Sequence, residues 1–237
     1  MSFYYWRPVF APDSTETSAL QENQVRTLYV RYFEVDRPDG DSTLRTGATI
    51  RFDSSPSGYS IVPVIHFQSR VFEKMDSSAI PSFTRMILDM IRRIDTPAHL
   101  QPDEIQFDCN WTEPARIRYF SFLRHFAILS GSVISSTIHL QHLKGSESVP
   151  PVDHGVLVYE KPIAHRYTPA LRSYPLPMDL ALPITSPVSA DDLLEMVSEV
   201  RRHSNHQLHN LIFFYIDREN LARYKKGFFK EVLDHTD

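Results

Sequence analysis

Short apolar runs rich in Val, Ile, Phe and Tyr recur along the whole chain, separated by turn-forming residues. Runs of this length bounded by turn signals are typical of buried β-strands. Eight such runs stand at residues 3–10, 25–36, 60–68, 104–111, 133–141, 154–161, 179–186 and 210–217. The pattern therefore predicts eight strands.

Several gaps between the runs show apolar positions at helical spacing. These helical patterns occupy residues 77–95, 113–129, 189–202 and 219–235. Strands that alternate with helices predict right-handed βαβ units and a parallel sheet, and eight parallel strands can close into a barrel. We therefore predict an α/β fold, a small (β/α)8 barrel of TIM type.

Two connections lack a clear helical pattern, residues 37–59 and 142–153, where we expect loops or short extra strands. The barrel is thus expected to be irregular, with some outer helices missing. An open doubly wound sheet is the alternative fold. It calls for a glycine-rich first turn, whereas the chain has 7 glycines and neither a G-x-G-x-x-G nor a Walker loop.

Length and composition fit one domain over residues 1–237, with 42% hydrophobic and 23% charged residues. The net charge is -4 and Lys and Arg are scattered, so nucleic acid is not expected as a partner. Cys109 is the only cysteine, which excludes an intrachain disulfide and a Cys-based zinc site. Its favoured interpretation is a small buried hydrophobe. The composition gives no indication of oligomeric state.

No segment approaches the roughly 18 apolar residues of a membrane span, so we expect no transmembrane segment and a soluble chain. As written, the start shows no leader and indicates a cytoplasmic protein. The mature sequence of a periplasmic protein or a lipoprotein would show the same start after removal of its leader.

Polar residues follow one face of several predicted strands. Inward and outward positions alternate along a barrel strand, so a polar row on an otherwise apolar strand is expected to point inward. Two strands carry the clearest rows, namely Gln106, Asp108 and Asn110, and then Ser135, Thr137, His139 and Gln141.

Other candidates stand toward the carboxyl ends of their strands, where the sites of such barrels form. They are Trp6, Arg7, Arg31, Glu34, Asp36, His66, Gln68, Trp111, Tyr159, Glu160 and Asp217. Together with the inward rows, they predict a polar pocket at one mouth of the barrel.

Structural roles are the alternative for each candidate. Asp108 could pair with Arg31 or Arg7 inside the barrel, because either charge buried alone would be costly. Asp217 is the better candidate for a helix N-cap than for catalysis. The acidic residues Glu34, Asp36 and Glu160 fit solvated loops, the aromatic residues Trp6, Trp111 and Tyr159 fit core packing, and His66 and His139 fit core positions. His203, His206 and His209 match no zinc motif, so we expect them at the surface.

Several strings, in their order, resemble an uncharacterised bacterial family, a domain of unknown function often found as secreted proteins or lipoproteins and similar to glycoside-hydrolase barrels. The strings are FYYWRPVF, LYVRYFEVD, IQFDCNWT, RYFSFLR, SSTIHLQ, PPVDHGVLVYE, YPLPMDLALPI and FFYIDRENLARY. The resemblance implies an aspartate pair D-C-D-W on the fourth strand, an R-L-H on the fifth and a Y-N on the sixth. This chain keeps Asp108 but has Asn110 at the second aspartate, reads His139-Leu140-Gln141 on the fifth strand, and has Tyr159-Glu160 on the sixth.

Three functions fit these residues. The first is a glycoside hydrolase with Asp108 and Glu160 as catalytic carboxyl groups, where Glu34 or Asp217 could replace Glu160, and with an oligosaccharide or cell-envelope glycan as its partner. The substrate-binding candidates are Trp6, Arg31, Asp36, His66, Asn110, Trp111, His139, Gln141 and Tyr159. The second is a non-catalytic barrel that binds a glycan or a protein at the same mouth through neutral amides. The third is a metal-dependent hydrolase, but its residues, His66, His139, Asp36 and Asp108, lack a ligand spacing, so we expect no metal or cofactor.

Overall fold

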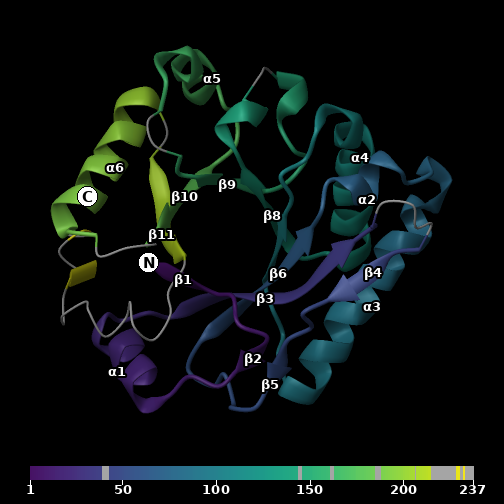
Figure 1. Ribbon diagram of the computed structural model, residues 1–237, viewed down its shortest axis with the longest axis horizontal. Coiled ribbons are helices and arrows are strands. Elements are labelled where there is room, and N and C mark those ends of the chain that lie inside the picture. Colours follow the sequence, from purple (N-terminus) through teal and green to yellow (C-terminus); the bar gives the residue numbers. More distant parts are fainter. Residues whose placement is uncertain are drawn as a thin grey trace.

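Eight parallel strands form a closed barrel, as the sequence predicted (Figure 1). The computed structural model describes residues 1–38, 43–143, 146–160, 163–184, 188–205, 207–214, 228–229 and 232. The barrel strands are β1 (Ser2–Tyr5), β3 (Thr27–Asp36), β6 (Ser60–Phe67), β7 (Glu104–Asp108), β8 (Val133–Ile138), β9 (His154–Val158), β10 (Met178–Pro183) and β11 (Leu208–Phe214). β1 pairs in parallel with both β11 and β3, and this closes the ring.

Three short strands lie outside the ring. β4 (Arg45–Gly47) pairs antiparallel with the end of β3, and β2 (Val9–Phe10) pairs with β5 (Arg51–Phe52). Among the described residues, no helix stands between β3 and β6, which confirms the expectation of loops and extra strands for residues 37–59.

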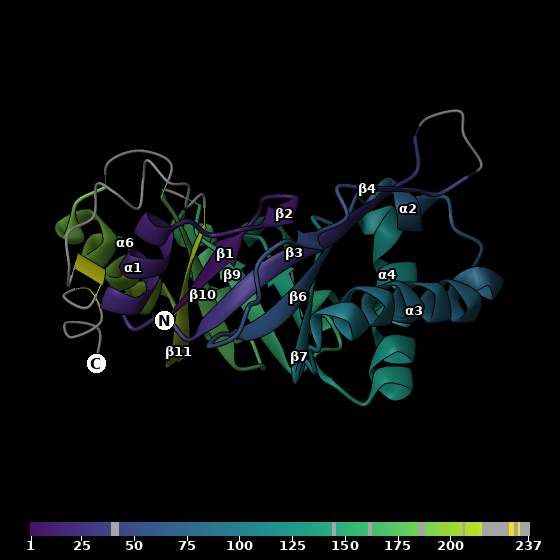
Figure 2. The same ribbon diagram turned by 90° about the horizontal axis from the view of Figure 1, so that it is seen from below.

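The helices lie outside the ring of strands, with α3 and α4 on one side of the barrel and α1 and α6 on the other (Figures 1 and 2). They are α1 (Ser14–Glu22), α2 (Arg70–Glu73), α3 (Ile80–Ala98), α4 (Glu113–Ser130), α5 (Thr168–Arg172) and α6 (Ala190–His203). The 3-10 turns are η1 (Ser77–Ala79), η2 (Leu140–His142), η3 (Ser146–Ser148) and η4 (His165–Tyr167).

Three of the four predicted helices are confirmed as α3, α4 and α6, whereas the pattern at 219–235 falls almost wholly outside the described residues. Capping residues explain their ends. Ser189 caps α6 in a reciprocal capping box with Asp192. Gly131 ends α4 with a φ of 67°, a left-handed conformation that favours glycine.

The core has two layers. Inside the barrel, a small cluster fills the space between the strands: Tyr4, Tyr29, Val62, Val64, Val156, Ala181 and Ile212. Between the strands and the helices, a larger cluster includes closely packed phenylalanines such as Phe67, Phe107 and Phe122. Cys109 is fully buried in this outer layer, which confirms its predicted role as a buried apolar residue.

Candidate functional site

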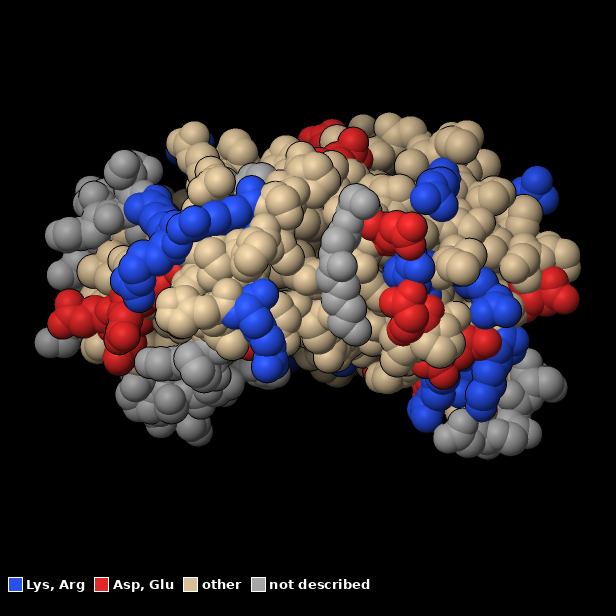
Figure 3. Space-filling view, turned by 90° about the horizontal axis from the view of Figure 1, so that it is seen from above, with Lys and Arg blue, Asp and Glu red and all other residues tan. Residues whose placement is uncertain are grey.

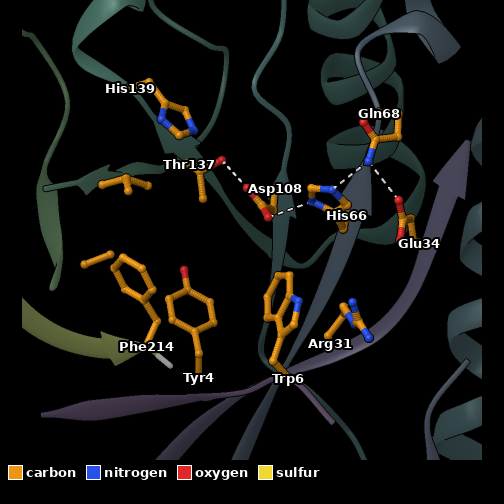
Figure 4. A pocket seen from close by; sticks show the side chains of 12 residues that line it. Tyr4, Trp6, Arg31, Glu34, His66, Gln68, Asp108, Thr137, His139 and Phe214 are labelled. Atoms are coloured by element: carbon orange, nitrogen blue, oxygen red, sulfur yellow. Dashed lines mark hydrogen bonds and ion pairs between the residues drawn. The ribbon is translucent and has the colours of Figure 1, made fainter. Parts of the chain in front are cut away.

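A pocket of about 380 Å³ opens over the barrel interior, lined by residues at or near the carboxyl ends of the strands (Figure 4). Its polar lining consists of Tyr4, Arg31, Glu34, His66, Gln68, Asp108, Thr137 and His139. Trp6, Val158, Ala181 and Phe214 complete the wall. This is the end of the barrel where active sites form in proteins with this fold.

Asp108 and His66 face each other across two neighbouring strands. His66 on β6 is in register with Asp108 on β7, and its Nδ1 lies 2.8 Å from Oδ2 of that carboxylate. The Thr137 hydroxyl donates to the other oxygen, Oδ1, also at 2.8 Å. Both oxygens of Asp108 are therefore held, and the side chain is fixed in one orientation.

Each member of the pair favours the charged form of the other. Burial opposes the charged form of Asp108, but the hydrogen bond and charge of His66, with help from Thr137, outweigh burial and lower the pKa of the carboxyl. Burial likewise opposes the charged imidazole, yet Asp108 and Glu34 together raise the pKa of His66. When the imidazole is protonated, the two side chains form an ion pair, and its members are 25% and 19% exposed.

Glu34 reaches the same pocket because β3 is irregular. The register between β3 and β6 shifts between Arg31 and Phe33, so Arg31 lies opposite Val64 while Glu34 lies opposite His66. Such a bulge re-aims the side chains that follow it. Gln68 then donates to Oε1 of Glu34 at 2.8 Å.

Arg31 and Trp6 form a second unit in the pocket. The guanidinium carbon of Arg31 lies 5.1 Å from the centre of the Trp6 ring, a cation–π contact. The Trp6 ring also meets His66 edge-on, at 6.1 Å between ring centres, and is 38% exposed. The partner of Asp108 is His66, whereas the sequence analysis gave Arg31 or Arg7 as the alternative, structural partner.

Two further pairs of predicted residues lie near the mouth. His139 Nδ1 lies 2.8 Å from Oε1 of Glu160, whose side chain is 48% exposed, and Gln141 donates to Oδ1 of Asn110 at 2.6 Å. Only His139 among these four lines the pocket. Glu160 is thus linked to the pocket through His139 but does not line it.

Three other candidates lie away from the pocket lining. Asp36 accepts two hydrogen bonds from Arg70, each 2.6 Å long. The two aromatic candidates are buried: Trp111 stacks on His142 at 4.0 Å between ring centres, and Tyr159 donates to Glu199. Asp217 lies outside the described residues.

The histidines expected at the surface include one that the structure buries. His203 ends α6 with only 8% of its surface exposed and lies 2.5 Å from the Thr168 hydroxyl of α5. The surface prediction is wrong for His203, because the apolar face of α6 carries it inward. His206 lies outside the described residues.

Sequence reasoning did not single out Tyr4, which lines the pocket floor. Its hydroxyl donates to Oε1 of Gln106 at 2.5 Å, inside the barrel. Tyr4 lies on β1, two residues before Trp6, which directly follows that strand, so alternation along this run was the signal that could have found it.

Neither a metal centre nor a membrane helix emerges from the described residues. No group of three or more His, Cys, Asp and Glu side chains there is arranged to hold a metal ion. No helix in the same part of the chain is long and apolar enough to cross a membrane. On the face shown in Figure 3, Lys and Arg are spread among acidic and uncharged residues.

The fold is that of glycoside-hydrolase barrels. A chitinase from Rhizomucor miehei matches with a TM-score of 0.61 and 11% identity over 99% of each chain. A GH18 chitinase from Cycas revoluta matches at 0.57 and 8% identity, over 100% of this chain and 99% of the other. A xylanase-A-amylase inhibitor protein matches at 0.58 and 10% identity, over 99% and 98%.

These likenesses establish the class of the fold, a small TIM barrel similar to those of glycoside hydrolases. No model of a known protein family matches the chain, and no curated protein matches it in sequence. The shared fold includes both hydrolases and an inhibitor protein, so function has to be argued from the pocket.

Proposed function

We propose that the protein is a carbohydrate-active barrel that binds an oligosaccharide in this pocket and hydrolyses one of its glycosidic bonds. The observation that carries the proposal is the register of β3, β6 and β7, which aligns Glu34, His66 and Asp108 in one pocket. Two carboxyl groups that flank one binding site are what most glycoside hydrolases use. The likeness in fold supports the proposal by analogy alone.

The two carboxyl groups take different roles. Asp108, whose pKa is lowered, is the base that activates a water molecule, and Glu34 is the acid that protonates the leaving oxygen. Glu34 and Asp108 lie on the two strands that flank β6, so their Cα atoms are about 10 Å apart, two strand spacings. In this assignment Asp108 activates the water directly and forms no covalent intermediate, so the expected outcome is inversion at the anomeric carbon.

Glu34 replaces Glu160 as the proposed partner of Asp108. Glu160 is bonded to His139 and is absent from the pocket lining, whereas Glu34 is part of it. Among the other candidates, Trp6, Arg31, His66 and His139 line the pocket and are the proposed substrate contacts.

The test is release of reducing ends from a panel of oligosaccharides. We expect Asp108→Asn and Glu34→Gln each to lower the rate by about 100-fold or more while the fold is retained. Glu113→Gln is the matched control, since Glu113 is an exposed residue of α4 paired with Arg116. Loss of activity in Glu160→Gln but not in Glu34→Gln would return the role to Glu160, and no cleavage of any glycan by the wild type would refute hydrolysis.

A non-catalytic glycan-binding barrel is the second candidate, and one observation favours it. Both oxygens of Asp108 already accept hydrogen bonds, from His66 and Thr137, as expected of a carboxylate with a structural role. Saturable binding of an oligosaccharide without any product, measured by calorimetry and chromatography, would support this function over hydrolysis.

A further inference from the structure

Arg31 is a pocket cation without a carboxylate partner among the described residues. Its Nε atom is buried there and has no hydrogen-bond partner. The contact with the Trp6 ring orients the guanidinium group beside the pocket (Figure 4). Because Arg31 lines the pocket and its guanidinium group has no acceptor within the described chain, this group is suited to an acceptor that enters the pocket.

Two arginines elsewhere on the barrel are paired with carboxylates, whereas Arg37 and Arg118, which do not line this pocket, bond to backbone carbonyl oxygens. Arg7 bonds to Glu16 at 2.7 Å, and Arg70 binds Asp36 through two hydrogen bonds of 2.6 Å. The second arrangement is the planar match of guanidinium and carboxylate that arginine makes best. Arg7 and Arg70 thus have carboxylate partners, while Arg31 in the pocket has none in contact.

The carboxylates inside the pocket are committed to other groups. Asp108 is held by His66 and Thr137, and Glu34 accepts the amide of Gln68. The bulge in β3 also separates Arg31 from Glu34 along the strand, so that each meets a different residue of β6. An anionic group entering the pocket would therefore meet Arg31 without displacing an ion pair.

We propose that the pocket takes a glycan with an acidic sugar and that Arg31 binds the carboxylate of that sugar while the partly exposed Trp6 ring packs against the sugar. The fork of N–H donors on arginine matches a carboxylate in two parallel bonds. This inference rests on the proposed function only in taking the ligand to be a glycan, and it does not require cleavage. The carboxylate has two chemical sources, the C6 carboxyl of a hexuronic acid and the lactyl carboxyl of N-acetylmuramic acid.

The experiment measures binding by isothermal titration calorimetry with two matched pairs of probes. Tetragalacturonate is compared with its methyl ester, and the disaccharide GlcNAc–MurNAc is compared with chitobiose, from which it differs in the lactyl group. We expect the wild type to bind the acidic member of one pair on the order of 10-fold more tightly than the neutral member. The pair that shows the preference identifies the source of the carboxylate.

Arg31→Gln is expected to reduce this preference to less than about 2-fold, because it weakens binding of the acidic member far more than binding of the neutral member. Arg31→Lys keeps the charge without the fork and is expected to retain part of the preference. Arg51→Gln is the control, since Arg51 is an exposed residue paired with Asp53. A thermal melt of each variant shows that it folds.

Equal binding of acidic and neutral probes by the wild type, no binding of either, or a preference that survives in Arg31→Gln would overturn the inference. Cleavage of neutral oligosaccharides with no acidic preference would leave the proposed hydrolase intact and remove only the role of Arg31. Binding through Arg31 without any cleavage would leave the role of Arg31 intact and refute hydrolysis.

Discussion

The ion pair between Asp108 and His66 predicts how the imidazole responds when the carboxylate loses its charge. Asp108→Asn keeps the shape of the side chain but removes the charge that raises the pKa of His66. Burial, the largest effect, and the charge of Arg31 remain and oppose the charged imidazole, and only the smaller effect of Glu34 still favours it. We therefore expect the pKa of His66 to move from above its ordinary value of 6.5 to below it in the variant.

The same substitution lowers stability. The Nδ1 and Oδ2 atoms are 2.8 Å apart and the side chains are 25% and 19% exposed, so the pair is intermediate between surface and buried. Breaking it is expected to cost about 2 kcal/mol, between the values for exposed and buried pairs. In a chain of 237 residues this corresponds to a fall in Tm of about 4–8 °C.

The loss of stability in Asp108→Asn depends on pH, and the direction follows from the two pKa shifts. The raised pKa of His66 contributes stability that is fully present below pH 6.5, the ordinary pKa of histidine. This stability is lost as the pH rises through the pKa of His66 in the folded protein. The lowered pKa of Asp108 contributes stability that is complete above 3.8 and is lost as the pH falls. The difference between wild type and variant is thus largest between these two values and smaller in alkaline solution.

Histidine Cε1–H resonances, followed by NMR over a pH titration and assigned with His66→Gln, measure the pKa directly, and urea unfolding at about pH 5.5 and 9 measures the stability. Thr137→Val is the control, because it removes a hydrogen bond to the same carboxylate but leaves its charge. A pKa of His66 that stays above 6.5 in Asp108→Asn would show that another group raises it.

Three further predictions concern stability. Burial raises the pKa of Asp95 from 3.8 to about 6, so the charged carboxylate lowers stability as the pH rises. The variant Asp95→Asn keeps an acceptor for the Tyr32 hydroxyl. Urea unfolding should show it to be more stable than the wild type by up to about 3 kcal/mol at about pH 8, with no gain below about pH 4. In Gly155→Ala the new Cβ would lie 2.2 Å from Cδ1 of Ile138, so calorimetry should show a loss of about 1–3 kcal/mol, and unchanged stability would mean that Ile138 moves freely. Phe107→Ala opens a cavity among buried rings and should cost about 3–5 kcal/mol in denaturant unfolding; a loss under about 1 kcal/mol would contradict the packing described.

The barrel could be predicted because each strand carries its own apolar run. The ends of the strands could not be predicted as well. The first apolar run, 3–10, covers both β1 and β2, and Pro8 lies in the break between them. The helix α1 was missed because its polar sequence buries only Glu16 and Leu20, which gives no helical apolar stripe.

The pocket was predictable strand by strand but not across strands. Alternation correctly pointed Asp108, Thr137 and His66 toward one interior, whereas their partners depend on register, which no single strand reveals. Arg31 is in register with Val64, one inward position before His66. Asp108 therefore meets the histidine and not the arginine that was its alternative partner.

The chemistry of the pocket depends on one irregular step in β3. Strict alternation from Tyr29 would point Arg31 and Phe33 inward and turn Glu34 toward the helices. The shift after Arg31 leaves both Tyr32 and Phe33 buried in the outer layer, where the Tyr32 hydroxyl meets α3, and returns Glu34 to the pocket. A regular β3 would keep the barrel and lose the carboxyl that faces His66. Likeness of fold is therefore insufficient evidence for hydrolysis, and Glu34→Gln is the substitution that most directly separates a hydrolase from a binding barrel.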